Sequence, residues 1–417
     1  MIYFVSSTNP INTRSGLEKR CNLWWHYWHQ QGQTVQWVEL SGRKPWFNIV
    51  ERVLLKVIPA KLLPYSVLLY RFFEWPSVLT MLRHNATLSR VLRQSETRDD
   101  TVFIFRAYTL HYLSARRFAK LLRASGTLIV DFDESDYRSR NTFMATNAAW
   151  LTLKNEVFER EKRLLAARSV QIYVSGENEI DGFRKLYAIE RPVSVMPNKL
   201  TINPPFMLRK LTQPVHCLLI GTFAYRPNAE MLEVLLEELL PTLTSRSELQ
   251  FHVVGGGLPT LLKKQLTAYT NVHCYGFVED TPLEQMYRNV HFMLAPLKSG
   301  GGIKYKIVES LAYGLPIVAT PKALEGFDLQ PQQHYLPYQA STFESDVAAL
   351  LGQPALYENM SRQGYEHYQQ LYYFPTNNRN SDQDLNEHDN GNYCIPKPQG
   401  IPTGSVGVVD EPDLSAL

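Results

Sequence analysis

The sequence predicts an α/β protein built from two similar doubly wound lobes that face each other across a cleft and are joined near residue 200. Its 417 residues exceed what one hydrophobic core usually serves. Apolar strand-like runs alternate with helical patterns, as in parallel sheets with helices on both faces. This rhythm breaks at Pro204 and Pro205 and then starts again.

The N-terminal half opens with a βαβ unit. The run IYFVSS is followed by a helical pattern from about Gly16 to Gln31, which Gly32 ends, and then by TVQWVEL. Further strands are expected at TVFIF, TLIVDFD, QIYVS and VSVMPN, with helices around 110–124 and 147–167. We therefore predict an N-terminal domain over residues 1–198.

The second half repeats the pattern in HCLLIG, LQFHVVGGG, NVHCYGFV, HFMLAPL and LPIVAT, with a helix from about Asn228 to Leu240. This predicts a second domain over residues 199–355. A helix over 356–373 follows, and in a two-lobed chain it can return to brace the first lobe. The remaining 374–417 is rich in Asn, Asp, Pro and Gly and predicts a disordered tail.

Composition limits the functional class. The net charge of +3 argues against a strongly basic nucleic-acid binder, and no apolar run reaches membrane-spanning length. The first residues lack the pattern of a secretory signal, and the four cysteines are scattered without a metal or disulfide spacing. We expect a cytoplasmic protein.

Residues 43–93 carry nine Lys or Arg against two Glu, interleaved with large apolar residues. This pattern fits a segment that lies on an anionic membrane, and it fits a helical insertion packed on the N-terminal lobe equally well. The first interpretation predicts peripheral contact with the inner face of the plasma membrane.

Three glycine-rich turns in the second half are suited to a diphosphate: GTFAYRPN from Gly221, VVGGG around Gly255, and SGGGIKYKIVES from Ser299. Glycines let phosphate approach backbone amides, and a helix start adds positive charge. In the third turn, Gly300, Gly301 and Gly302 lead to a helix with Lys304, Lys306 and Glu309. The lysines can offset phosphate charge and the carboxylate can accept ribose hydroxyls, with no metal or other cofactor. A flexible loop with solvated lysines is the alternative.

The stretch YGFVEDTPLEQMYRNVHFMLAPLKSGGGIKYKIVESLAYGLPIVATPKALEGF resembles the donor-site signature of retaining GT-B glycosyltransferases of family 4, the glycosyl transferases group 1. LLIGTFAYRPN and VSVMPNKL are similar to its first C-domain turn and inter-domain segment. The resemblance implies two Rossmann-like lobes and sugar transfer, with retention, from a nucleoside-diphosphate sugar.

Carried over by position, the resemblance implies that Glu309 binds ribose and that Lys304 and Lys306 lie near the donor phosphates. Gly221 would approach the diphosphate with Arg226 as a charge partner, and Gly276, Phe277 and Val278 would lie beside the base. One position departs from the family, in which two glutamates eight residues apart are expected. Glu309 matches the second glutamate, but Gly301 stands at the position of the first.

The N-terminal half offers weaker candidates. Ser15 and Gly16 open a helix after the first strand, with Arg20 one turn in, and either a cleft role or an ordinary helix start explains them. Asp131 ends a strand at the edge where ligands of open sheets collect, so an acceptor contact or a base is expected there. Asp131-Phe-Asp133 also fits a metal motif of another glycosyltransferase fold, but we expect no metal. Ser175 reads as a helix N-cap.

We therefore expect a glycosyltransferase that uses a nucleotide-sugar donor and a saccharide or lipid-linked saccharide acceptor in polysaccharide or glycoconjugate biosynthesis. Lys304, Lys306 and Asp131 are the expected catalytic residues. A catalytically silent nucleotide-sugar-binding subunit and a sugar-nucleotide epimerase of the same fold are the alternatives.

Overall fold

The computed structural model describes residues 1–6, 8–39, 91, 100–106, 118–119, 121–122, 126–132, 158–166, 170–243 and 248–376. Several expectations fall outside these residues. They are the basic apolar segment apart from Val91, most of the helix expected around 110–124, residues 147–157 of the helix expected around 147–167, the metal-motif position Asp133, and the tail from residue 377 onward.

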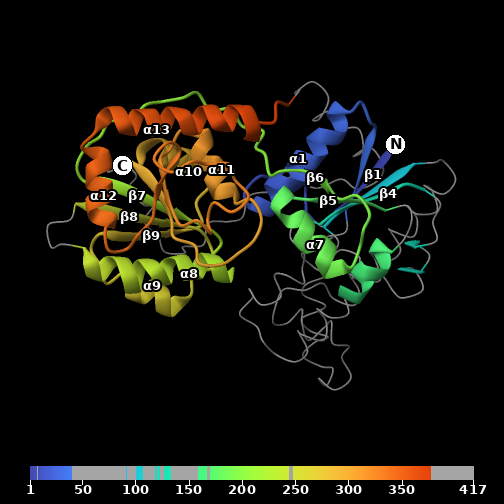
Figure 1. The fold of residues 1–417 in the computed structure, drawn as a ribbon, viewed down its shortest axis with the longest axis horizontal. Coiled ribbons are helices and arrows are strands. Elements are labelled where there is room, and N and C mark those ends of the chain that lie inside the picture. Colours follow the sequence, from blue (N-terminus) through green and yellow to red (C-terminus); the bar gives the residue numbers. More distant parts are fainter. Residues whose placement is uncertain are drawn as a thin grey trace, which may run out of the picture.

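Two lobes lie side by side, each with a central parallel sheet of six strands (Figure 1). The N-lobe sheet contains β1 (Ile2–Ser6), β2 (Val35–Glu39), β3 (Thr101–Phe105), β4 (Leu128–Asp131), β5 (Val170–Val174) and β6 (Ser194–Val195). Its strand order is β2-β1-β3-β4-β5-β6, and every pair is parallel. The order reverses between β1 and β3, which places the turn after β1 at a ligand-binding edge.

Helix α1 (Gly16–Gln30) follows that turn and has a defined start and end. Ser15 accepts from the backbone N–H of Glu18, and the Glu18 side chain accepts from the backbone N–H of Ser15, a complete capping box. Gly32 follows the helix with a φ of +69°, which a glycine adopts without strain. The predicted helix and its end are confirmed.

Both faces of the N-lobe sheet are covered. On one face, α1 buries Trp24, Trp25 and Trp28 against Phe4 and Phe103. The other face is covered by the helical residues 158–165 and by α7 (Ile180–Tyr187), which follows the short turn η4 (Glu177–Glu179). The core under α1 is rich in large aromatic side chains.

The C-lobe sheet contains β7 (Val215–Ile220), β8 (Leu249–Val254), β9 (Val272–Gly276), β10 (Phe292–Ala295), β11 (Ile317–Ala319) and β12 (Tyr335–Pro337). The order β12-β11-β10-β7-β8-β9 is the doubly wound order of a dinucleotide-binding domain. It reverses between β7 and β10. The turns that follow these two neighbouring strands are GTFAYRPN and the loop that leads to SGGGIKYK, so the strand order brings two of the three predicted turns together.

The C-lobe helices are α8 (Arg226–Val234), continued by η5 (Leu235–Leu239) and η6 (Leu240–Thr242), then α9 (Thr260–Leu266), α10 (Asp280–Asn289), α11 (Tyr305–Ala312) and α12 (Phe343–Leu351). Helix α8 begins two residues before the predicted Asn228. Pro227 lies in its first turn, where the missing N–H costs nothing.

Helix α13 (Pro354–His367), continued by η7 (Tyr368–Tyr372), belongs to the C-lobe and then leads back to the N-lobe (Figure 1). Tyr357, Met360 and Tyr368 are buried in the C-lobe core. Beyond η7, Phe374 packs against the α1 side of the N-lobe, and its N–H donates to Leu200 O over 2.8 Å. The expected helix is present, and the residues after it contact the first lobe.

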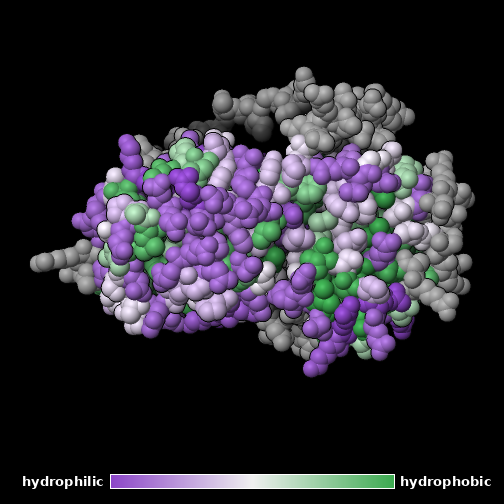
Figure 2. Space-filling view, turned by 45° about the horizontal axis from the view of Figure 1, so that its top comes forward, coloured by the Kyte–Doolittle hydropathy of each residue, from purple (hydrophilic) through white to green (hydrophobic). Residues whose placement is uncertain are grey.

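Within the described residues, no helix is long and apolar enough to cross a membrane. The face of the C-lobe seen in Figure 2 is mainly hydrophilic, with hydrophobic residues in small separate patches.

Candidate active site between the lobes

Glycines end the three neighbouring strands β7, β8 and β9 and let their backbones meet closely. A Cβ atom at Gly255 would lie 1.8 Å from the carbonyl oxygen of Gly221, and the φ of Gly255 is +139°. The N–H of Gly255 donates to Gly276 O over 2.6 Å. Only glycine fits at Gly255, because any side chain would overlap the turn after β7. The floor of the candidate site is therefore bare backbone.

The glycine triplet forms the loop before α11 at the same edge of the sheet. Gly300 and Gly302 have φ values of +99° and +66°, while Gly301 has no left-handed backbone. A Cβ at Gly302 would lie 3.3 Å from Ser175 Oγ of the N-lobe. The first backbone N–H groups of α11 receive no side-chain cap. Such a helix start is suited to an anion.

Lys306 lies in the first turn of α11 and reaches across to α8. Its Nζ donates to Asn228 Oδ1 over 2.7 Å. Burial, followed by the nearby charge of Lys304, lowers the pKa of Lys306 to about 7, and Glu309 acts in the opposite direction. Lys304 stands at the N-cap position of α11. Both predicted lysines therefore lie beside the uncapped helix start.

Glu309 is one turn farther along α11 and is buried. Tyr287 Oη donates to Glu309 Oε2 over 3.1 Å, and Lys19 Nζ from the N-lobe donates to Oε1. Burial and the charge of Glu309 raise the pKa of Tyr287 well above its usual range, so this phenol keeps its proton and serves as a donor. The carboxylate is thus held between the two lobes.

Other contacts also join the lobes here. A Cβ atom at Gly16 would lie 3.1 Å from Cδ2 of Tyr305, which is the first residue of α11. Asn198 Nδ2, in the segment between the lobes, donates to Ile303 O over 2.8 Å. The first turns of α1 and α11 therefore face each other at the cleft.

Comparison with known proteins agrees with this arrangement. Residues 214–344 match the family model described as glycosyl transferases group 1. The chain is similar in structure to sucrose-phosphate synthase from Thermosynechococcus elongatus, with a TM-score of 0.62 and 13% identity over 93% of this chain and 97% of that one. WaaG, a glycosyltransferase involved in lipopolysaccharide biosynthesis, gives a TM-score of 0.60 and 14% identity over 89% of this chain and 96% of that one.

HepE from Anabaena in complex with UDP gives a TM-score of 0.58 and 12% identity over 93% of this chain and 98% of that one. No curated protein matches the sequence. The match to glycosyl transferases group 1 falls entirely within the C-terminal lobe. Together with the two doubly wound lobes, this confirms the expected GT-B glycosyltransferase fold.

Asp131 lies at the end of β4, inside the N-lobe. It is fully buried, and Arg20 donates to both of its oxygens, from Nε over 2.9 Å and from Nη2 over 2.6 Å. Arg20 Nη1 also donates to Met196 O and to Asn198 Oδ1. In this geometry Asp131 holds a buried arginine rather than an acceptor hydroxyl, so we do not assign it the catalytic role predicted above.

Two other predictions are modified by the geometry. Arg226 pairs with Glu230 and Glu233 along α8, so acidic neighbours already offset its charge. Ser175 caps no helix: Gly176 occupies the N-cap of η4, and Ser175 Oγ donates to Glu179 Oε2 over 2.7 Å. A serine before a short helix is a common N-cap pattern, but the buried Glu179 side chain binds this hydroxyl instead.

The predicted base contacts follow β9. Gly276 has a φ of +73°, Phe277 is 55% exposed, and Val278 packs against the C-lobe core. Phe277 thus leaves an aromatic ring open to solvent beyond the strand end. Its part in base binding stays a prediction.

Sequence patterns did not single out Lys19, Tyr287, Asn198 or Asn228. Asn228 lies in the quoted GTFAYRPN turn and Asn198 in VSVMPNKL, so the quoted stretches already contained both residues. Tyr287 lies within the quoted donor-site stretch and Lys19 lies in the first helix of the N-lobe, but neither position in the sequence indicates a contact with Glu309. Only the docking of the elements reveals them.

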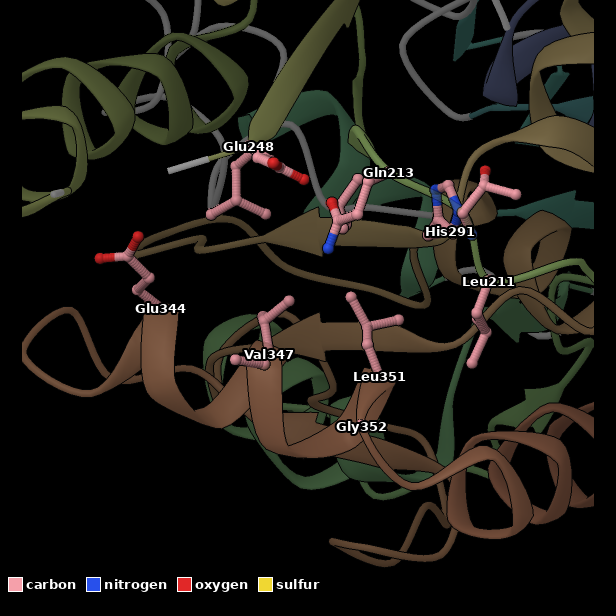
Figure 3. A pocket seen from close by; sticks show the side chains of 12 residues that line it. Leu211, Gln213, Glu248, His291, Glu344, Val347, Leu351 and Gly352 are labelled. Atoms are coloured by element: carbon pink, nitrogen blue, oxygen red, sulfur yellow. The ribbon is translucent and has the colours of Figure 1, made fainter. Parts of the chain in front are cut away.

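A further hollow of about 620 Å³ lies at the opposite edge of the C-lobe sheet, where β7, β8 and β10 begin. Figure 3 shows side chains of α12 on one wall, facing those of Gln213, Glu248 and His291. It contains none of the predicted donor residues. Within the described residues, no group of three or more His, Cys, Asp or Glu is arranged to hold a metal ion.

Proposed function

We propose that the protein transfers a sugar from a nucleoside-diphosphate sugar to a hydroxyl group of a saccharide or lipid-linked saccharide. The observation that carries the proposal is the grouping of four features at one sheet edge. These are the bare glycine turns, the uncapped start of α11, Lys306 and the buried carboxylate of Glu309.

The donor is proposed to lie along α11. Its diphosphate would accept from the backbone N–H groups after Gly302, where the helix dipole is positive. Its ribose would donate to Glu309, one turn farther on, whose carboxylate Tyr287 fixes through Oε2. The spacing of one turn between Lys306 and Glu309 suits a phosphate followed by a ribose.

During transfer, the bond between the sugar and the diphosphate breaks, and negative charge builds up on the departing diphosphate. Lys306, Lys304 and the first amides of α11 lie where they can stabilise this charge without reorganising. We propose that no metal or other cofactor is needed. Closure of the lobes, through the contacts between α1 and α11, would exclude water and align the acceptor.

We further propose that transfer retains the anomeric configuration and serves polysaccharide or glycoconjugate biosynthesis on the cytoplasmic side of the membrane. Support comes from the group 1 match and from the likeness to WaaG, a glycosyltransferase involved in lipopolysaccharide biosynthesis. The likeness to HepE in complex with UDP and glucose supports a nucleotide-sugar donor.

A thermal-shift and turnover screen tests this function. The purified chain is tested with UDP, GDP and ADP and their glucose, mannose and N-acetylglucosamine derivatives, and binding to the folded state raises the melting temperature. For the donor that binds, Glu309→Ala and Lys306→Ala should each weaken affinity about tenfold or more. The control, Lys322→Ala, removes a surface lysine paired with Glu325 and should change nothing. Unaltered affinity in both site variants would refute the proposed site.

A catalytically silent nucleotide-sugar-binding subunit is the second candidate, and Gly301 favours it, because it stands where the family resemblance expects a glutamate. Product analysis separates the candidates. Release of nucleoside diphosphate with a glycosylated acceptor supports the transferase, whereas donor binding without any product supports the silent subunit. An epimerised donor would point to an isomerase instead.

A further inference from the structure

Lys19 binds the carboxylate of Glu309, which the proposed function assigns to the donor ribose. Its Nζ donates to Glu309 Oε1, and the Lys19 and Glu309 side chains are only 15% and 10% exposed. Tyr287 holds the other oxygen, Oε2. Both oxygens of Glu309 therefore accept a hydrogen bond from another side chain of the protein.

The two partners of Glu309 differ in how far they can move. Tyr287 is fully buried in the C-lobe core, and its ring stacks on Tyr313 with 5.1 Å between ring centroids. Lys19 is a flexible side chain in the first turn of α1, on the other lobe. A ribose that uses both oxygens of Glu309 must therefore displace Lys19 rather than Tyr287.

A displaced Lys19 requires a new partner, because an ammonium group in a mostly buried cleft is costly without a counter-charge. Its backbone is held near the start of α11, since Gly16 packs against Tyr305 and Asn198 binds Ile303 O. That helix start is where the proposed donor has its diphosphate. A diphosphate at that helix start would offer a displaced Lys19 a counter-charge.

We propose that Lys19 is a donor-selecting residue: it pairs with Glu309 in the empty protein and moves to the diphosphate when the ribose takes its place. This inference rests on the proposed function. A nucleoside alone must break the Lys19–Glu309 pair and offers no compensating anion, whereas a nucleoside diphosphate does. Lys19 would therefore favour diphosphates over nucleosides and would couple donor binding to the position of the N-lobe.

Calorimetry on the full chain tests this by measuring the affinities of a nucleoside diphosphate and of its parent nucleoside. The diphosphate used is whichever of UDP, GDP and ADP binds best. The variants are Lys19→Met, which removes the charge and keeps the length, and Lys19→Arg, which keeps the charge. Arg14→Met is the matched control, because Arg14 is another N-lobe cation that pairs across the cleft, with Glu279 at 3.5 Å. Its pair is 56% and 61% exposed, whereas the Lys19–Glu309 pair is largely buried.

Lys19→Met should bind the nucleoside about fivefold tighter and the diphosphate about fivefold more weakly, so the selectivity between them should fall about 25-fold. Lys19→Arg should keep most of the selectivity, and Arg14→Met all of it. Should Lys19→Met not fold, Lys19→Gln replaces it.

If the diphosphate binds but Lys19→Met leaves the ratio of the two affinities unchanged, the role of Lys19 is refuted and the proposed function stands. If none of the three diphosphates binds the wild-type chain, the proposed function itself fails and the Lys19 proposal fails with it. A shift of both affinities by the same factor would show that Lys19 supports the cleft structurally and does not select the donor.

Discussion

Lys306 on α11 donates from Nζ to Oδ1 of Asn228 on α8 over 2.7 Å, so this side chain joins the two helices that start at the glycine turns. The amide of Asn228 is itself oriented, because its Nδ2 donates to Thr222 O over 3.0 Å. An amide oxygen accepts from the ammonium but carries no full negative charge. Asn228 therefore directs Lys306 without stabilising its charge as a carboxylate would.

Donor binding should weaken as the pH rises above neutrality. The pKa of Lys306 is lowered to about 7, first by burial and then by Lys304, so the ammonium form is lost above pH 7. A diphosphate prefers the ammonium, so its affinity should fall about threefold or more between pH 7.5 and 9, where its own ionisation is complete. Calorimetry in buffers of different ionisation enthalpy should show proton uptake on binding.

Two variants test whether Lys306 causes this pH dependence of donor affinity. Lys306→Arg keeps its charge over this range and should flatten the pH dependence. Asn228→Asp puts a carboxylate beside Nζ, which should move the fall in affinity to higher pH, whereas Asn203→Asp at an exposed position should not. A wild-type affinity that is equal at pH 7.5 and 9 would contradict the assignment of Lys306 to the diphosphate.

Breaking the Arg20–Asp131 pair should destabilise the N-lobe rather than act on catalysis directly. Both side chains are fully buried, and removing one leaves an uncompensated charge, at a cost of about 3–5 kcal/mol. Asp131→Ala should lower the midpoint of urea denaturation markedly, whereas Asp181→Ala on the exposed side of α7 should not. Full stability with lost turnover would instead restore Asp131 as a catalytic residue.

The local parts of the fold were predictable from sequence because they depend on neighbouring residues. The end of α1 at Gly32 and the glycine triplet before α11 follow from residue type and spacing. For Arg20 the sequence left a cleft role and an ordinary position at a helix start both open, because helix periodicity alone cannot tell a cleft-facing arginine from one buried against a strand end. Its partner Asp131 is 111 positions away. The Lys19–Glu309 contact spans 290 positions and exists only because the lobes meet.

Acid should destabilise the C-lobe through a histidine cluster on its sheet. His216 Nδ1 and His252 Nε2 share a hydrogen bond of 2.8 Å, and the ring of His291 stacks on that of His216. Burial, followed by neighbouring histidines, lowers the pKa of His252 to about 3 and that of His291 to about 4.

The folded state thus keeps these rings neutral while the unfolded chain takes up protons below about pH 6.5. Stability should fall as the pH drops from about 6.5 towards 4, on the order of 2 kcal/mol between pH 7 and 4.5. His252→Gln removes one of these groups, so its urea midpoint should depend less on pH than that of the wild type. If the urea midpoints of the two proteins change equally with pH, the histidine cluster is not the cause of the acid sensitivity.

Gly255→Ala should damage both stability and donor binding, while its neighbour tolerates the same change. A Cβ at Gly255 would lie 1.8 Å from Gly221 O, and the backbone φ of +139° disfavours any side chain. At Gly256 a Cβ meets nothing within 4 Å. Alanine at Gly255 must push the turn after β7 away from β8, which costs about 2 kcal/mol or more and displaces the amides proposed to face the diphosphate. Melting temperature and diphosphate affinity, measured for Gly255→Ala and Gly256→Ala in parallel, test this. Equal values for the two variants would mean that the close approach of Gly255 and Gly221 does not shape the site.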